Sequence, residues 1–239
     1  MGFLGVTLVM LGVCGKMDAS IVDFYVGNGC FFARQHTLIT EFEIKSEQRD
    51  AKELTAVAAY AGGRIPASGQ LCYENTNGTD VYVDYGAAEV VALRVANSAQ
   101  LQRALGVYFR TFVLLERDAA HPQGVWGRPD LRDLGPAYRA LIGVPGGLDG
   151  PLGQFVRAAN LHNMTLVAGN GSDADTLGTD TVYVMDSVAF PPLQAELCLQ
   201  FHDDTTVKYS AEYHQLNSSL LESGRLHATI CPANFICGS

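Results

Sequence analysis

The 239-residue sequence has little positive charge, a single tryptophan and no hydrophobic run long enough to span a bilayer. Its 16 Lys and Arg residues are outnumbered by 25 Asp and Glu residues, which gives a formal net charge of −9, and the basic residues form no cluster. This balance argues against nucleic acids and anionic membrane surfaces as partners. No internal repeat is visible. The 48% content of hydrophobic residues suffices for one compact domain with insertions, and we expect a monomer.

Residues 1–20 have the character of a secretory signal peptide. An apolar run after Met1 ends in small residues near Gly15, where a signal peptidase could cut, although positive charge is missing from its start. Four glycosylation acceptor sequences, which begin at Asn77, Asn163, Asn170 and Asn217, would fit a glycoprotein. We therefore expect a secreted protein or one in the lumen of the secretory pathway, with the cytoplasm or an organelle as the alternative.

The cysteines are few and odd in number once the signal peptide is removed. If Cys14 leaves with that segment, the remaining five are Cys30, Cys72, Cys198, Cys231 and Cys237. An odd number in an oxidising compartment leaves at least one thiol unpaired or cycling. Cys72 and Cys198 are expected to be structural or buried, while a zinc site of His227, Cys231 and Cys237 would have none of the usual spacings. No metal is expected.

The stretch Gly27–Phe32 places a cysteine where thiols become reactive. The β-like run 21–26 stops at glycines, and a helical pattern begins with Cys30. A helix N-terminus has unpaired N–H groups and partial positive charge, which favour the thiolate, and the glycines would leave the sulfur uncovered. Phe31 and Phe32 could wall an apolar pocket beside it. The alternative is a buried cysteine in an ordinary strand-to-helix turn.

The rest of the pattern mixes strands with helices in a single domain, residues 21–239. Strands are expected at 54–60, 85–95, 135–142, 181–185 and 205–209, and helices at 29–43, 98–112 and 194–201, with Ser98 as an N-cap. The segment 143–180, rich in Gly, Asp and Asn from residue 146, is expected to be a surface insertion because it cannot supply a second core. A polar tail is expected over 218–239.

Six fragments in order are more informative than any one of them. They are Gly29-Cys30-Phe31-Phe32, Tyr60-Ala61-Gly62-Gly63, Gly86-Ala87-Ala88-Glu89-Val90-Val91, Asp133-Leu134-Gly135-Pro136-Ala137-Tyr138-Arg139, Ser210-Ala211-Glu212-Tyr213-His214-Gln215, and a cysteine near a glycine at the C-terminus. This series resembles the A-type peptide-methionine sulfoxide reductases from about Ile21 to the end. The family pattern is Gly-Cys-Phe-Trp, Tyr-Ala-Gly-Gly, Gly-His-Ala-Glu-Val-Val, Asn-Asp-x-Gly-x-Gln-Tyr-Arg-Ser and Ala-Glu-x-Tyr-His-Gln.

The resemblance implies an α+β fold, a two-layer sandwich of the ferredoxin-like kind with surface insertions. It also implies reduction of the S-epimer of methionine sulfoxide, free or in proteins, with Cys30 attacking the sulfoxide sulfur as a thiolate. The departing oxygen must be protonated, and Glu89 matches the catalytic glutamate of the family. Such a carboxyl must hold a proton near neutral pH, which partial desolvation would allow.

The resemblance also assigns the residues around that oxygen. Tyr138 matches one oxygen-binding tyrosine and Tyr73 best matches the other, although Tyr82 or Tyr85 could serve in place of Tyr73. Asp133 matches an aspartate expected to orient groups of the site rather than to react. Phe31 and Phe32 would enclose the S-methyl group of the substrate.

A second thiol must reduce the sulfenic acid that forms on Cys30. The resemblance implies a resolving cysteine in a C-terminal tail, for which Cys237 is the first choice and Cys231 could shuttle or pair with it. The alternative is a purely structural clip between these two residues. No organic cofactor is implied, because sulfur carries the electrons, and the partners would be oxidised substrates and an external dithiol such as thioredoxin.

Several residues depart from the family pattern. The tryptophan of the family is Phe32 here, its histidine is Ala87, its asparagine is Arg132, and its glutamine and serine are Ala137 and Ala140. These losses remove hydrogen bonds that would hold the site rigid, so they predict low activity or an altered substrate preference.

Two other functions stay open on the sequence. One is a secreted, catalytically silent relative that acts as a binding or structural module. A buried Cys30, or a Glu89 far from Cys30, would favour this function. The other is a cysteine hydrolase in which an imidazole lies within hydrogen-bond reach of Cys30. Because His36 is on the same expected helix and points elsewhere, His214 is the residue to check.

Overall fold

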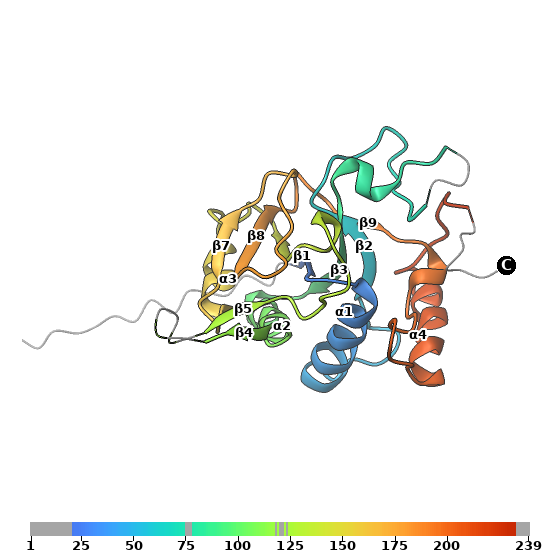
Figure 1. Cartoon of the computed structure of the whole chain (residues 1–239). Coiled ribbons are helices and arrows are strands. Elements are labelled where there is room, and N and C mark those ends of the chain that lie inside the picture. Colours follow the sequence, from blue (N-terminus) through green and yellow to red (C-terminus); the bar gives the residue numbers. More distant parts are fainter. Residues whose placement is uncertain (1–20, 75–77, 118, 120–121, 123, 233–239) are drawn as a thin grey trace, which may run out of the picture.

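The structure is a computed structural model of the whole chain, and it describes residues 21–74, 78–117, 119, 122 and 124–232. A mixed sheet with the strand order β7-β8-β6-β1-β3-β2-β9 forms its centre (Figure 1). The strands are β1 (Val22–Gly27), β2 (Val57–Ala61), β3 (Ala88–Val95), β6 (Leu141–Val144), β7 (Thr165–Ala168), β8 (Thr181–Asp186) and β9 (Leu193–Gln194). A separate hairpin joins β4 (Val113–Glu116) and β5 (Val125–Gly127).

Four α-helices accompany the sheet: α1 (Phe31–Thr37), α2 (Ser98–Phe109), α3 (Gly153–Ala159) and α4 (Ala211–Glu222). A π-helix, Leu38–Ser46, continues α1, and short 3-10 helices cover Tyr82–Tyr85, Pro136–Tyr138 and Leu197–Leu199. Helix α1 packs on β2 and β3, and α2 packs on β1 and β3. The described sheet is open rather than closed into a barrel, so the prediction of an α+β fold built on a sheet and packed helices is confirmed.

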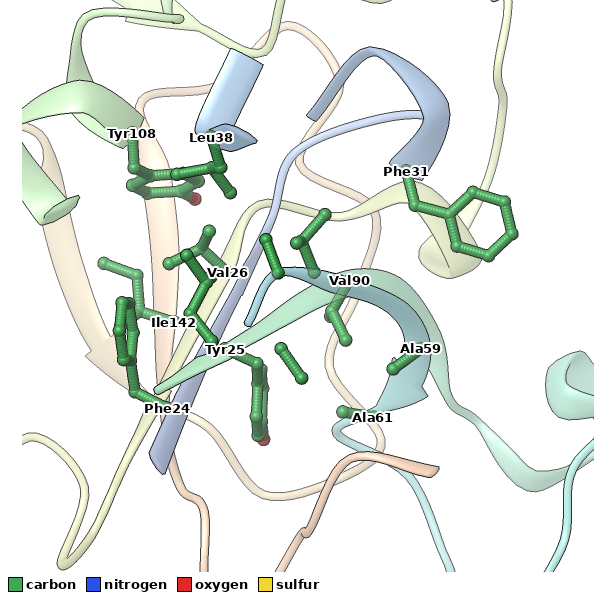
Figure 2. Packing of buried hydrophobic residues seen from close by; sticks show 14 of the residues in the cluster. Phe24, Tyr25, Val26, Phe31, Leu38, Ala59, Ala61, Val90, Tyr108 and Ile142 are labelled. Atoms are coloured by element: carbon green, nitrogen blue, oxygen red, sulfur yellow. The ribbon is translucent and has the colours of Figure 1, made fainter. Parts of the chain in front are cut away.

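Strand β1 lies at the centre because its sequence is apolar on both faces. Phe24, Tyr25 and Val26 are at most 1% exposed, and Figure 2 shows them among the buried side chains of the cluster. The neighbouring β6 comes very close, since a Cβ atom at Gly143 would lie 2.0 Å from the Tyr25 ring. Only glycine fits there, which fixes the side of the sheet on which the Tyr25 ring lies.

Helix α2 shows how the 3.6-residue period sets burial. Leu101, Leu105, Tyr108 and Phe109 are all buried on one face, as their spacing predicts. The predicted N-cap Ser98 is wrong by one residue. Asn97 is the cap, since its side chain accepts a hydrogen bond of 3.0 Å from the N–H of Gln100.

Three other predicted elements differ from the structure. Residues 194–201 end β9 and form a 3-10 turn rather than a helix, and residues 205–209 form no strand. In the predicted strand 135–142, Pro136 opens a 3-10 turn and the strand starts only at Leu141, because proline cannot donate to a strand ladder. The strand predicted at 85–95 begins at Ala88, after Gly86 has turned the chain with φ +70°.

The glycine-rich segment 143–180 takes part in the sheet. It contains α3 and β7, and β7 pairs in parallel with β8, which itself pairs in parallel with β6. Val156 and Ala159 of α3 are buried in the same cluster as the sheet residues. The segment therefore extends the existing core rather than building a second one. Among the residues described, no helix is both long and apolar enough to cross a bilayer.

Candidate active site

Cys30 lies in the turn between β1 and α1. Gly29 has φ +106°, its N–H donates to the carbonyl of Tyr138 at 3.0 Å, and a Cβ atom there would lie 2.8 Å from the Cβ of Asp130. A glycine is therefore required at this turn. Helix α1 begins at Phe31 with Cys30 as its N-cap, as the sequence predicts.

The sulfur, however, is not uncovered. Cys30 is 8% exposed, and burial raises the pKa of its thiol well above the ordinary value, with the neighbouring carboxyl of Glu89 acting in the same direction. The backbone N–H of Phe32 acts in the opposite direction and is outweighed. The expectation that this helix start favours the thiolate is thus wrong for the free protein, because desolvation and a nearby acid exceed the effect of the helix N-terminus.

Glu89 lies in β3, directly beside the start of α1. Its Oε2 accepts the N–H of Phe31 at 2.9 Å, its Oε1 accepts the hydroxyl of Tyr82 at 3.3 Å, and the carboxyl also shares a hydrogen bond with the Cys30 thiol. Burial raises the pKa of Glu89 to about 8, more than these hydrogen bonds lower it. The carboxyl therefore holds a proton at neutral pH, as a general acid must.

Three phenols lie next to this acid and are called here the tyrosine cluster: Tyr73, Tyr82 and Tyr138. The rings of Tyr73 and Tyr82 stack at 5.8 Å, and Tyr138 shares hydrogen bonds with both hydroxyls. Burial raises the pKa of Tyr73 to about 12 and those of the other two further, so all three remain hydrogen-bond donors.

The structure brings Tyr73, Tyr82 and Tyr138 together and leaves Tyr85 outside. Among the alternatives weighed for the second oxygen-binding tyrosine, Tyr82 is the one joined directly to Glu89. The hydroxyl of Tyr85 instead donates to Asp80 at 2.6 Å. The grouping of Tyr82 with Tyr73 and Tyr138 was not predicted, because it depends on the 3-10 turn Tyr82–Tyr85. This turn places the Tyr82 ring on that of Tyr60, with ring centroids 4.5 Å apart.

Asp133 forms a pair with a second acid that the sequence did not single out, Asp130. Asp130 Oδ1 accepts the N–H groups of Arg132 at 3.1 Å and of Asp133 at 3.4 Å, and its carboxyl also accepts the N–H of Cys30. These bonds lower the pKa of Asp130, whereas burial and the hydrogen bond to Asp130 raise the pKa of Asp133 to about 7. An aspartate three residues before another, after a proline, is the turn signal that would have found it.

The loop that carries Asp130, Asp133 and Tyr138 is held by buried charges. Arg128 is 1% exposed and donates to the carbonyls of Asp130 and Asp133, and it pairs with Asp175 at 3.3 Å. Asp175 also accepts the N–H of Gly135 at 2.8 Å. This arrangement was not predicted, because Asp175 lies in the segment 143–180, which was expected to be a surface insertion.

Arg139 anchors the other end of the same loop. It is fully buried, donates to the carbonyls of Pro136, Gly62 and Gly86, and lies 3.9 Å from the carboxylate of Asp173. The segment 143–180 thus supplies Asp173 and Asp175, which contact the two ends of this loop.

Phe31 and Phe32, the expected aromatic walls, are both buried at the start of α1. The rings of Phe31 and Phe32 lie 5.0 Å apart, and Figure 2 shows Phe31 at the margin of the buried cluster, where α1 starts. Phe31 also contacts Tyr60 at 5.8 Å, and Phe32 stacks on His202 at 4.6 Å. These flat, apolar surfaces could enclose a methyl group.

The histidines needed for a cysteine hydrolase have other partners. The ring of His214 lies 2.6 Å from the carbonyl of Phe201 through Nδ1 and 3.1 Å from Asp203 through Nε2. His36 stacks on Tyr209 at 3.8 Å. With both of its nitrogens engaged elsewhere, His214 is not the imidazole base that the hydrolase requires.

Cys30 is the one free cysteine in the described part of the chain. Cys231 forms a disulfide with Cys72. This pairing rules out the structural clip between Cys231 and Cys237, and it rules out a bond between Cys72 and Cys198. Cys198 is also in a disulfide. The first-choice resolving residue, Cys237, lies outside the described residues.

The carboxylate of Glu196 connects the Cys72–Cys231 disulfide to the candidate site. Glu196 accepts the N–H of Tyr73 at 2.8 Å and the hydroxyl of Tyr60 at 2.9 Å, and its ligand atoms lie within 4.8 Å of both sulfurs. Since the two sulfurs are bonded to each other, the group is not a free set of metal ligands. The His227–Cys231–Cys237 set, already disfavoured by its spacing, lacks the Cys231 thiolate for the same reason.

One glycosylation acceptor is already engaged in the fold. The side-chain amide of Asn217 donates to the carbonyl of Leu197 at 2.9 Å, a bond that a glycan on that nitrogen would disturb. Asn163 and Asn170 are exposed. The acceptor at Asn77 and the signal-peptide segment 1–20 lie outside the described residues.

The comparisons with known proteins find similarity in structure but not in sequence. No protein-family model matches the chain, and no curated protein sequence matches it either. Methionine sulfoxide reductase A of Corynebacterium diphtheriae is 13% identical, with 87% of this chain and 76% of that chain covered and a TM-score of 0.43. Mxr1 from Saccharomyces cerevisiae, in its reduced form, is 17% identical over 82% of this chain and 92% of that chain, with a TM-score of 0.42.

Proposed function

We propose that this chain is a thiol-dependent reductase that converts the S-epimer of methionine sulfoxide, free or in proteins, to methionine. The observation that carries the proposal is Glu89, a buried carboxyl with a raised pKa that contacts the start of α1 at Phe31 and the hydroxyl of Tyr82. A protonated acid, phenol donors and a free thiol in one place are what the removal of a sulfoxide oxygen requires.

In the first step, the Cys30 sulfur attacks the sulfoxide sulfur and an S–S bond forms between them. The protonated oxygen then bonds to the Cys30 sulfur, while this S–S bond and the original S–O bond break. The products are the sulfenic acid, which keeps one proton, and methionine, whose sulfur has gained two electrons. Glu89 donates its proton to the developing oxyanion and regains one from the thiol. Tyr82 and Tyr138 donate hydrogen bonds to the same oxygen while its charge grows.

In the second step, a thiol attacks the sulfenic acid, forms a disulfide with Cys30 and releases water. Cys237 is the proposed resolving residue, and it acts in this step as a reduced thiol. Cys231 can take this role only after its bond to Cys72 is reduced. A thioredoxin-type dithiol then reduces the Cys30 disulfide, so that no metal or organic cofactor is involved in the proposed cycle.

The raised pKa of Cys30 favours a second candidate, a silent relative that binds but does not turn over. A thiol that is 8% exposed and lies beside a carboxyl is a poor nucleophile unless another group accepts its proton. In the proposed reductase the sulfoxide itself provides that destination, because its oxygen accepts the proton through Glu89. The second candidate has no such use for a protonated buried acid.

The test is the reduction of separated S- and R-sulfoxide epimers of N-acetyl-methionine amide by the purified chain with dithiothreitol. The matched variants are Cys30→Ser and Glu89→Gln, which keep the shapes of the side chains. Turnover of the S-epimer alone, lost with Cys30→Ser, is expected. Absence of turnover of both epimers, in folded protein whose Cys30 is shown to be reduced, would contradict the proposal and leave the binding module.

A further inference from the structure

The guanidinium of Arg34, one helical turn after Cys30, has no hydrogen-bond or ion-pair partner among the described residues. Its Nε is buried without a hydrogen bond, and no hydrogen bond or ion pair joins the side chain to another residue in the described ranges. Cys30 and Asp204 lie within electrostatic reach of the group. Arg34 is half-buried, and a partly desolvated cation without a protein partner is costly, which makes it a candidate to pair with an anionic group from outside the chain.

Arg34 opens into a hollow of about 360 Å³, called here the Arg34 hollow. Its polar lining consists of Arg34, Asp130, Arg132, Asp133 and Asp204, together with threonine hydroxyls at 205 and 206. The volume lies in the range of small-molecule sites. Because the carboxyl of Asp130 accepts the N–H of Cys30, this hollow lies directly beside the backbone of the proposed nucleophile.

The charges around the hollow do not suit a simple anion. Asp130 and Asp133 share a hydrogen bond, and Asp204 accepts the N–H of Thr205 at 2.7 Å, which leaves its other oxygen available. These carboxylates repel a ligand that carries only a negative charge and attract an ammonium group. A ligand with one carboxylate and one ammonium group could pair its carboxylate with the Arg34 guanidinium and its ammonium group with the acids.

We propose that the Arg34 hollow binds the charged ends of free methionine sulfoxide, with Arg34 on its α-carboxylate and Asp204 on its α-ammonium group. This inference rests on the proposed reductase and names its preferred substrate as the free amino acid. A methionine sulfoxide within a polypeptide has amides in place of both charges, so it leaves Arg34 unpaired. A C-terminal residue offers the carboxylate alone and meets the repulsion of the acids.

The experiment compares four substrates that differ only in the two charges. They are the S-sulfoxides of methionine, N-acetyl-methionine, methionine amide and N-acetyl-methionine amide. We expect kcat/KM to be highest for the free amino acid and to fall roughly 10- to 100-fold when the carboxylate becomes an amide, as for the loss of a charged hydrogen bond. Equal values for the free amino acid and the doubly blocked form would overturn the inference and leave the reductase intact. An advantage for N-acetyl-methionine over the free amino acid would assign the hollow to C-terminal residues and overturn the preference proposed here.

Variants locate the effect. In Arg34→Gln the penalty for losing the carboxylate should shrink to about threefold or less, and Arg34→Lys should restore part of it. Arg132→Gln is the matched control, because it removes the same charge from an exposed position on the same hollow. The same loss in Arg132→Gln would show that general charge, rather than Arg34, sets the preference, and would overturn the assignment.

Binding separates this inference from the proposed function. Titration of Cys30→Ser with free methionine sulfoxide and with its doubly blocked form, followed by calorimetry, requires no turnover. Tighter binding of the free amino acid that is lost in Cys30→Ser/Arg34→Gln would support the Arg34 site even if the unaltered chain reduced nothing. Equal binding of the two ligands would overturn it.

Discussion

Two acids of the site, Glu89 and Asp133, both have raised pKa values but come from very different surroundings. Glu89 belongs to a regular strand between β1 and β2, and its raised pKa is due to burial in the core. Asp133 belongs to an irregular loop and is half-buried, and its raised pKa also depends on the shared hydrogen bond with Asp130. Packing within the strand holds Glu89 in place, whereas hydrogen bonds between side chains and the loop backbone hold Asp133. This difference predicts which substitutions change chemistry and which change structure.

The largest expected effect is the loss of activity when the Glu89 carboxyl is replaced by an amide. Glu89→Gln should lower kcat by about 10²- to 10⁴-fold, because an amide of the same shape cannot protonate the sulfoxide oxygen. The unfolding free energy near pH 7 should rise rather than fall, since Glu89 must take up a proton on folding at this pH whereas a glutamine need not. Single-turnover reduction and urea unfolding measure the two quantities, and a large loss of stability with kcat preserved would contradict the proposed role.

On the loop side, the expected loss is one of stability. Arg128→Met should lower the free energy of unfolding by about 2–4 kcal/mol, because it leaves two loop carbonyls and Asp175 without their buried partner. Urea titration at pH 7 measures it, and the exposed Arg132→Met serves as the control, with a change within about 0.5 kcal/mol. Equal effects of the two substitutions would mean that Arg128 does not hold the loop.

Within the tyrosine cluster the expected effects are smaller. Tyr82→Phe should lower kcat/KM by roughly tenfold through the loss of one hydroxyl donor to Glu89 and the substrate oxygen. Tyr85→Phe, which removes a hydroxyl that donates to Asp80, is the matched control and should leave kcat/KM unchanged. A loss confined to Tyr85→Phe would exchange the roles of the two residues.

The smallest effect expected is a shift in pH dependence that links the two acids. A step that needs protonated Glu89 should slow as the pH rises through about 8, the pKa of that carboxyl. Asp133 contributes to the raised pKa of Glu89, so Asp133→Asn should move this decline to lower pH. The pH profile of kcat measures it. A shift to higher pH, or none, would show that the loop acid does not reach the strand acid.

The pH dependence of stability has the same sign. Because the folded protein holds the Glu89 proton up to about pH 8 whereas an exposed glutamate releases it near 4.5, the folded state binds more protons between these values. Stability from this group is present below pH 4.5 and is lost as the pH rises towards 8. Glu89→Gln removes that component, which urea unfolding at several pH values can check.

The strand side of the site could be predicted from the sequence, and the loop side only in part. The apolar run before Gly27, the glycines around Cys30 and the run that follows Glu89 are local patterns, and they predict β1, the start of α1 and β3. Tyr138 and Asp133 could be placed through resemblance. Arg128 and Asp130 could not, because their function depends on carbonyls and carboxylates brought close by the loop itself. The uncovered sulfur was a wrong prediction for the same reason, since local glycines do not reveal what packs over a turn.

The Cys72–Cys231 bond joins residues 159 positions apart. A ribosome must therefore have made almost the whole chain before the second of these thiols emerges, so the bond cannot guide early folding of the strands that precede it. The bond can form only after the residues of all the strands have been made. A chain truncated before residue 231 would keep every residue of the strands and yet leave Cys72 without its disulfide partner.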